Sequence, residues 1–381
     1  MPEGVVAGGV NAVLSRRLAR LPESVMPLLY VAAVKGRQLD MPVLAYIQAN
    51  YYTDSPHIDE WLLTGVNGAV LDVAEQSMRF AHDKLRESVL AMLSSADLQR
   101  VNHEVATAIE AVYPGETELR AAVLAKHWRA ADDVEREAHY LQIVGEGQLQ
   151  TSAFQDALAT VQRYAQLKRA FQTSDVLYGL ARAQHGLGNN DVAVVHLKRA
   201  RHLAAAAGDT VNIARVQAML ANVLWQLGRY AQAKTAAQQA RDAAVATGNT
   251  LIEADVLAVL GAITALTALP SASQPLYEEA LAIYRNGDHQ KGVAETYNRL
   301  GTNALAMGLA ENAETYFTQS AELCEAMGDR FGWLAANNNI AALHLIQGQL
   351  TDAYHRYGES RGLAKRIGAQ YPYGVATQQA G

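Results

Sequence analysis

The second half of the chain follows a helical pattern of apolar and polar positions. In one representative stretch, the apolar residues are Val216, Leu220, Val223, Leu224 and Leu227. Spacings of three and four residues place such side chains on one face of an amphipathic helix. Short turns containing glycine interrupt these stretches, so the sequence predicts antiparallel helical hairpins.

The hairpins repeat with a period of 40 residues. The turn position within each hairpin is held by Gly188, Gly228, Ala268, Gly308 and Gly348. A small residue stands seven positions earlier, at Ala181, Ala221, Gly261, Gly301 and Ala341. Bulky residues are expected to fill the gaps between hairpins, at Leu197, Tyr230, Tyr277, Phe317 and Tyr357. Because a single hairpin cannot cover its own apolar face, the period predicts a solenoid of about six stacked hairpins over residues 134–370.

This pattern resembles the tetratricopeptide repeat. The small residue, the turn glycine and the following alanine recur in "LANVLWQLGRYAQAKTAAQQA" (220–240) and "LGTNALAMGLAENAETYFTQS" (300–320). An aromatic residue follows the turn at Tyr230 in the first segment and at Phe317 in the second. An ordinary repeat of this kind is about 34 residues long, so these helices are longer than usual. The resemblance implies an all-α, right-handed superhelix in which the first helix of each hairpin lines the concave face.

The first part of the chain differs from the repeats. The pattern predicts helices over 23–35, from 42, over 58–63 and over 83–93, and short strands over 69–73 and 77–80. Helices followed by a two-stranded wing are typical of a winged-helix domain, which we place at 1–93. A helical connector is expected over 94–133, and a flexible tail over 371–381.

The residues of this first part also resemble a known class of proteins. The segments 17–47 and 78–93 are similar to the winged helix of STAND-class signalling ATPases, including bacterial regulators with tetratricopeptide repeats. In related ATPases a His-Asp pair contacts the phosphates of bound ADP, so the resemblance implies that His82 is a nucleotide sensor. A simpler interpretation places His82 at a helix N-terminus, with Asp83 as the capping residue.

The chain contains no G-x-x-x-x-G-K-[ST] phosphate-binding loop. We therefore expect the ATPase core to be missing from it and name an upstream ATPase domain as a possible partner. Without that loop, residual nucleotide binding is the third-ranked hypothesis for function, and no cofactor is expected.

Composition and charge argue against a nucleic-acid interface. The net charge is −6, and the segment expected to read DNA, 55–68, contains Asp59 and Glu60 but no Lys or Arg. Contacts to phosphates and bases depend heavily on Arg and Lys. A DNA-binding regulator that acts through the winged helix is therefore only an alternative hypothesis.

Catalytic and metal-binding patterns are absent from the sequence. It contains neither H-E-x-x-H nor G-x-S-x-G, and its single cysteine, Cys324, falls on the second helix of a hairpin, between Leu323 and Met327. One cysteine excludes a disulfide framework and fits a reducing cytoplasm. No membrane span is expected, because no window approaches 18 uninterrupted apolar residues. The sequence predicts a non-enzymatic, cytoplasmic protein.

The remaining candidates lie on the predicted concave face. They are Tyr178, Arg182, Asn222, Trp225, Asn298 and Asn338. Asn298 and Asn338 are one period apart, and a carboxamide can both donate to and accept from a peptide backbone. The alternative is that these asparagines join neighbouring repeats. The leading hypothesis is a regulatory module that binds a protein or peptide on this face.

Overall fold

The computed structural model describes residues 14–74, 77–167 and 173–367, which are mostly helical. The chain forms two compact units, Met1–Val144 and Gly145–Gly381. The division falls inside helix α8 (Val134–Gln150). The tail expected over 371–381 lies outside the described residues.

The first unit combines helices with one small hairpin of strands. In order, it contains η1 (Glu23–Val25), α2 (Met26–Lys35), α3 (Met41–Tyr51), α4 (Ile58–Asn67), β1 (Leu71–Ala74), β2 (Ser77–Phe80), α5 (Asp83–Leu90), α6 (Ser95–Val112) and α7 (Thr117–Ala130). The strands pair antiparallel, with Leu71 opposite Phe80. Trp61, Phe80 and Trp128 are completely buried in one hydrophobic core.

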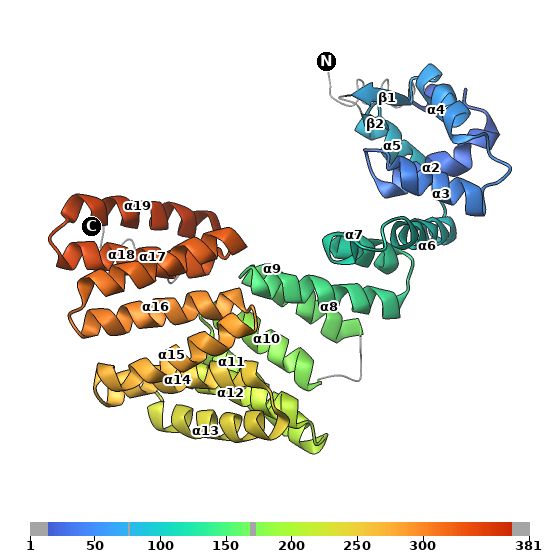
Figure 1. Ribbon diagram of the computed structural model, residues 1–381. Helices are drawn as coiled ribbons and strands as arrows, with labels where there is room; N and C mark the ends of the chain where they lie inside the picture. The colour runs from blue at the N-terminus through green and yellow to red at the C-terminus, as the bar shows by residue number, and fades with distance from the viewer. Residues whose placement is uncertain (1–13, 75–76, 168–172, 368–381) are drawn as a thin grey trace, which may run out of the picture. The chain divides into compact units, whose positions relative to one another are not determined.

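The second unit is a tetratricopeptide-like solenoid, and Figure 1 shows its helices stacked from α10 to α19. After α8 follow α9 (Phe154–Leu167), α10 (Ser174–Gly186), α11 (Asn190–Ala206), α12 (Thr210–Gln226), α13 (Tyr230–Thr247), α14 (Thr250–Thr267), α15 (Pro270–Asn286), α16 (Gln290–Ala306), α17 (Ala310–Met327), α18 (Arg330–Ile346) and α19 (Leu350–Ile367). The predicted all-α solenoid is confirmed.

The turns within the hairpins follow the sequence prediction. Gly188, Gly228, Gly308 and Gly348 have φ angles of +80°, +70°, +76° and +77°. In this left-handed region glycine avoids the steric penalty of a Cβ atom. The turn between α14 and α15 has no glycine and is built differently. Ala268 has a φ of −138°, and Pro270 begins α15.

The small and bulky positions of the repeat meet inside one hairpin. A Cβ atom on Gly301 would lie 2.5 Å from Cε1 of Phe317, and one on Gly261 would lie 2.7 Å from Cε1 of Tyr277. These contacts join the two helices of the same hairpin. The bulky residues, which were expected in the gaps between hairpins, therefore also fill the space within a hairpin.

Tyr230 does not belong to this set of buried bulky residues. It is 38% exposed, whereas Leu197, Tyr277, Phe317 and Tyr357 are buried. The position one period from Leu197 is Ala237, which is completely buried. The prediction for Tyr230 was wrong because this residue begins α13 and lies outside the helix-crossing register.

Helix α14 is the most apolar helix of the solenoid core. By length and composition it is long and apolar enough to cross a membrane, and half of its residues are buried inside the protein. It contacts α12, α13, α15 and α16. A helix at the centre of a stack has neighbours on several sides, which accounts for its apolar composition.

Candidate binding surface on the inner face of the solenoid

The first helices of successive hairpins form one continuous surface. Contacts join α10 to α12, α12 to α14, α14 to α16 and α16 to α18. In the described part of the chain, the second helices α11, α13, α15 and α17 pack only against the helices next to them in sequence. The first helices therefore lie on the more tightly curved side of the stack, which we call the inner face.

Tyr178 on α10 lies next to two arginines on this face. The Cζ atom of Arg215 is 4.4 Å from the centre of its ring, and that of Arg182 is 5.9 Å away. Each arginine also has a carboxylate partner. Arg182 donates to Glu146 at 2.6 Å, and Arg215 forms an ion pair with Asp175 of the preceding hairpin. The charges at this end of the inner face are therefore balanced.

Asn222 and Trp225 on α12 are brought together by a third arginine. Arg299 on α16 donates to Oδ1 of Asn222 at 3.3 Å, and its Cζ atom lies 5.3 Å from the centre of the Trp225 ring. It also donates to the carbonyl of Ala258 at 3.5 Å. Arg299 directly follows the candidate Asn298 but was not among the residues predicted for this face.

Two carboxylates on the inner face were also missed. Asp255 on α14 and Glu295 on α16 are one period apart and hold equivalent places in successive hairpins. The hydroxyl of Tyr284 donates to Asp255. Glu295 is exposed, with no hydrogen bond or ion pair to another described residue. The 40-residue period could have indicated them, because charged residues stand at four successive equivalent positions: Asp175, Arg215, Asp255 and Glu295.

The environment of Asp255 disfavours its charged form. The residue is exposed to solvent on one side, but the surrounding helices desolvate its carboxylate and raise its pKa to about 6. The negative charge of Glu295 adds to this increase, whereas the Tyr284 hydroxyl, Arg299 and Arg182 oppose it. A carboxylate in such surroundings gains from any further cation placed beside it.

Asn298 and Asn338 do not have equivalent surroundings. Nδ2 of Asn339 donates to Oδ1 of Asn298 at 2.9 Å, which joins two neighbouring hairpins. The Oδ1 atom of Asn338 is buried without a hydrogen-bond partner among the described residues. Asn337 binds Ser360 of α19 at 2.9 Å and so holds a hairpin together. The alternative role of asparagines as links between repeats applies to Asn298.

His82 lies at the N-terminus of α5. Its Nδ1 atom accepts a hydrogen bond from the backbone N–H of Lys84 at 3.1 Å, so His82 is the capping residue. The assignment of the cap to Asp83 was wrong. Asp83 is the first residue of the helix and pairs with Arg37 at 3.2 Å. A nucleotide contact by His82 stays a prediction.

The described residues contain no group of three potential metal ligands. Cys324 is buried at the end of α17, and burial raises the pKa of its thiol to about 12. A thiol with such a high pKa is not a reactive nucleophile near neutral pH.

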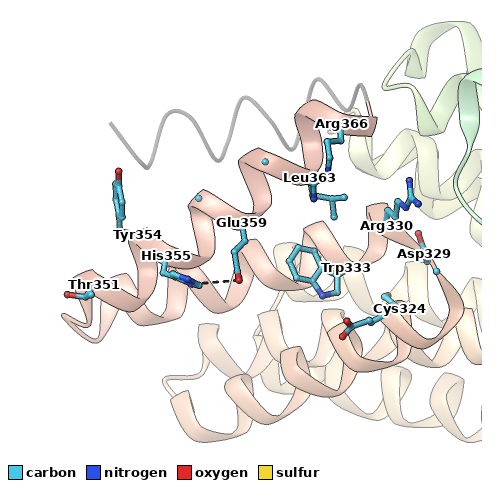
Figure 2. A pocket seen from close by; sticks show the side chains of 14 residues that line it. Cys324, Asp329, Arg330, Trp333, Thr351, Tyr354, His355, Glu359, Leu363 and Arg366 are labelled. Carbon is cyan, nitrogen blue, oxygen red and sulfur yellow. Dashed lines mark ion pairs between the residues drawn. The ribbon is translucent and has the colours of Figure 1, made fainter.

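A separate cavity lies at the C-terminal end of the solenoid, between the end of α17, the start of α18 and one side of α19 (Figure 2). Trp333 and Leu363 contribute apolar surface to it, and His355 pairs with Glu359 at 3.7 Å. None of the six residues predicted for the inner face lines this cavity.

Comparison with known sequences identifies the repeat. The sequence pattern of the tetratricopeptide repeat family matches residues 214–241 and 294–327. These segments lie within α12–α13 and α16–α17, the two hairpins in which the spacing predicted the repeat. No curated protein sequence matches the chain.

Several solved structures share the fold. One is a Signal Transduction ATPase with Numerous Domains (STAND) protein with a tetratricopeptide repeat sensor, from Pyrococcus horikoshii; the TM-score is 0.58 at 13% identity. The match covers 94% of this chain but only 53% of that protein. A Rap protein complexed with competence and sporulation factor has a TM-score of 0.55 at 13% identity, covering 75% of this chain and 85% of that one. NprR in complex with its cognate peptide NprX has a TM-score of 0.54 at 13% identity, covering 78% and 83%.

Proposed function

We propose that the solenoid is a regulatory module that binds a peptide, or an extended segment of a protein, on its inner face. The observation that carries this proposal is the gathering of aromatic, amide and charged side chains from successive first helices. Arg299 donates to Asn222, which is 77 residues earlier in the sequence, and its guanidinium lies over the ring of Trp225. Tyr178 lies between arginines of two hairpins.

The residue types on this face suit a peptide ligand. Trp, Tyr and Arg carry much of the binding energy in protein interfaces, because they bury a large area and still form polar contacts. Asn222 offers a carboxamide that can pair with both groups of a peptide bond. The Rap protein, whose fold is similar, was solved in complex with competence and sporulation factor, and NprR was solved with its cognate peptide NprX.

The test is capture of ligands from a randomised peptide library by the whole chain. We expect Trp225→Ala and Asn222→Ala each to reduce capture by about tenfold, as is usual for an important interface residue. Tyr230→Ala removes an exposed aromatic from α13 and serves as the control. Equal capture by the wild type and the two inner-face variants would refute the proposal.

We further propose that the first unit is a winged-helix domain with a connector, and that the chain acts in a STAND-type signalling system. Support comes from the order of helices and strands before α6, and from the similar STAND fold, which extends over 94% of this chain. In this proposal an ATPase domain is a partner, and His82 faces its nucleotide. We expect ADP to raise the melting temperature only when an ATPase domain has been added. This increase should be lost in His82→Ala.

A further inference from the structure

We infer that the inner face recognises a basic side chain of the ligand, and that Arg299 occupies the place of this side chain in the free protein. The inference rests on the proposed function and names the chemistry of the ligand. The site consists of the ring of Trp225, the amide oxygen of Asn222 and the carboxylates of Asp255 and Glu295.

Arg299 already demonstrates that the site accepts a guanidinium group. Its Cζ atom lies 5.3 Å from the centre of the Trp225 ring, and Asn222 accepts one of its hydrogen bonds at 3.3 Å. An aromatic face and a neutral acceptor are typical partners for arginine. The same geometry is available to an arginine or lysine from another chain.

The interactions of the Arg299 side chain are weaker than those of the other arginines of the inner face. Its two hydrogen bonds, to Asn222 and to the carbonyl of Ala258, measure 3.3 and 3.5 Å. By contrast, Arg182 and Arg215 each pair directly with a carboxylate. Charge-assisted bonds to carboxylates are shorter and stronger than bonds to neutral acceptors. A ligand can therefore displace Arg299 more easily than either of the other two arginines.

The balance of charge around the site favours a cationic ligand. Glu146 and Asp175 neutralise Arg182 and Arg215 at one end of the face. Asp255 and Glu295 remain, and neither forms an ion pair with a described residue. These two carboxylates face a single unpaired guanidinium, that of Arg299. An added cation would lie beside two carboxylates and an aromatic ring, which is a complementary environment.

The experiment uses acetylated and amidated hexapeptide pools, in which one position is fixed as Arg, Lys, Glu or norleucine and the others are random. Binding of each pool to the folded whole chain is measured by competition against the most tightly captured pool. The Arg and Lys pools are expected to bind at least about tenfold more tightly than the Glu pool. Asp255→Asn combined with Glu295→Gln is expected to abolish that preference.

The variant Arg299→Met distinguishes a displaced arginine from one that binds the ligand itself. Removing a competing cation should strengthen binding of the Arg and Lys pools about threefold or more. The matched control is Arg229→Met, because Arg229 pairs with Asp191 on exposed surface and its loss changes the net charge equally. This control should leave the preference unchanged.

The possible outcomes separate the two proposals. If no pool binds, the proposed function fails and this inference fails with it. If pools bind but the Glu pool is preferred, or Arg299→Met weakens binding of the basic pools, the inference fails while the proposed function stands. The basic preference should also decline as the pH falls below about 6, because protonation removes the charge of Asp255.

Discussion

Asp255 is the residue on the inner face whose titration should be visible in the stability of the fold. Desolvation by the surrounding helices raises its pKa to about 6, so the folded protein binds this proton more tightly than the unfolded chain. The contribution of Asp255 to stability therefore falls as the pH rises from about 4 through about 6. Above that range the charged form carries its full desolvation cost.

The variant Asp255→Asn should flatten this dependence. We expect its urea midpoint to exceed that of the wild type at about pH 7.5, and the difference to shrink towards pH 4. The groups that face Asp255 all remain in the variant; they are Tyr178, Arg182, Tyr284, Glu295 and Arg299. Asp191→Asn on exposed surface should leave the pH dependence unchanged. A difference that grows towards low pH would contradict the assignment.

At the same scale, the sequence located positions more reliably than partners. Spacing alone placed Tyr178, Asn222 and Trp225 on first helices of hairpins, because the period fixes which residues share a face. It could not reveal that Arg299 reaches Asn222 from 77 residues away. Such a contact depends on the curvature of the stack, which results from packing between hairpins and leaves no local signal in the sequence.

At the scale of the helices, close packing inside each hairpin depends on a small residue facing a large one. A Cβ atom on Gly301 would lie 2.5 Å from the Phe317 ring, so a larger side chain must displace that ring. We expect Gly301→Val to lower the free energy of unfolding by about 1–3 kcal/mol, the usual cost of overpacking.

Gly358→Val provides the matched control for this prediction. Gly358 is also a helical glycine, and a Cβ atom there would have no atom within 4 Å. Urea unfolding followed by circular dichroism measures both variants. Equal effects of the two substitutions would show that loss of glycine, rather than contact with Phe317, determines the cost.

Helices and turns were the most predictable part of the structure. The glycine turns could be predicted because a left-handed backbone conformation favours one residue type strongly. Helix ends were harder, since several residues compete for the same cap. At α5 the imidazole of His82 accepts the Lys84 N–H, although Asp83 is the commoner kind of capping residue. The prediction that Tyr230 is buried was wrong for another reason. An aromatic side chain in the first turn of a helix can stay exposed, as Tyr230 does.

At the scale of the whole solenoid, its first turn contacts helices far along the chain. Ser152 in the α8–α9 turn donates to Asp329 at 2.8 Å, across 177 residues. The ring of Phe154 lies 5.1 Å from that of Phe331. Lys291 at the start of α16 donates to the carbonyl of Gln150 at 3.3 Å. These contacts link the first hairpin to the last two.

Asp329 is the centre of this contact. It is only 4% exposed, caps α18 by accepting from the N–H of Gly332, and lies 3.8 Å from Lys291. A buried carboxylate needs such partners, because losing one leaves its charge poorly compensated. Lys291 supplies the compensating charge, so it stabilises the contact between the ends of the solenoid more than its partial exposure suggests.

The variant Lys291→Met tests whether this contact holds the first hairpin in place. Its removal should speed hydrogen exchange of the backbone amides in α9, while α12 and α13 exchange as before, because local opening reflects local contacts. Lys234→Met on the exposed side of α13 is the control, since it removes the same charge elsewhere. If α9 exchanges at its original rate in Lys291→Met, the hairpin is held by its neighbour α10 alone. In that case the contact across 177 residues contributes little to the fold.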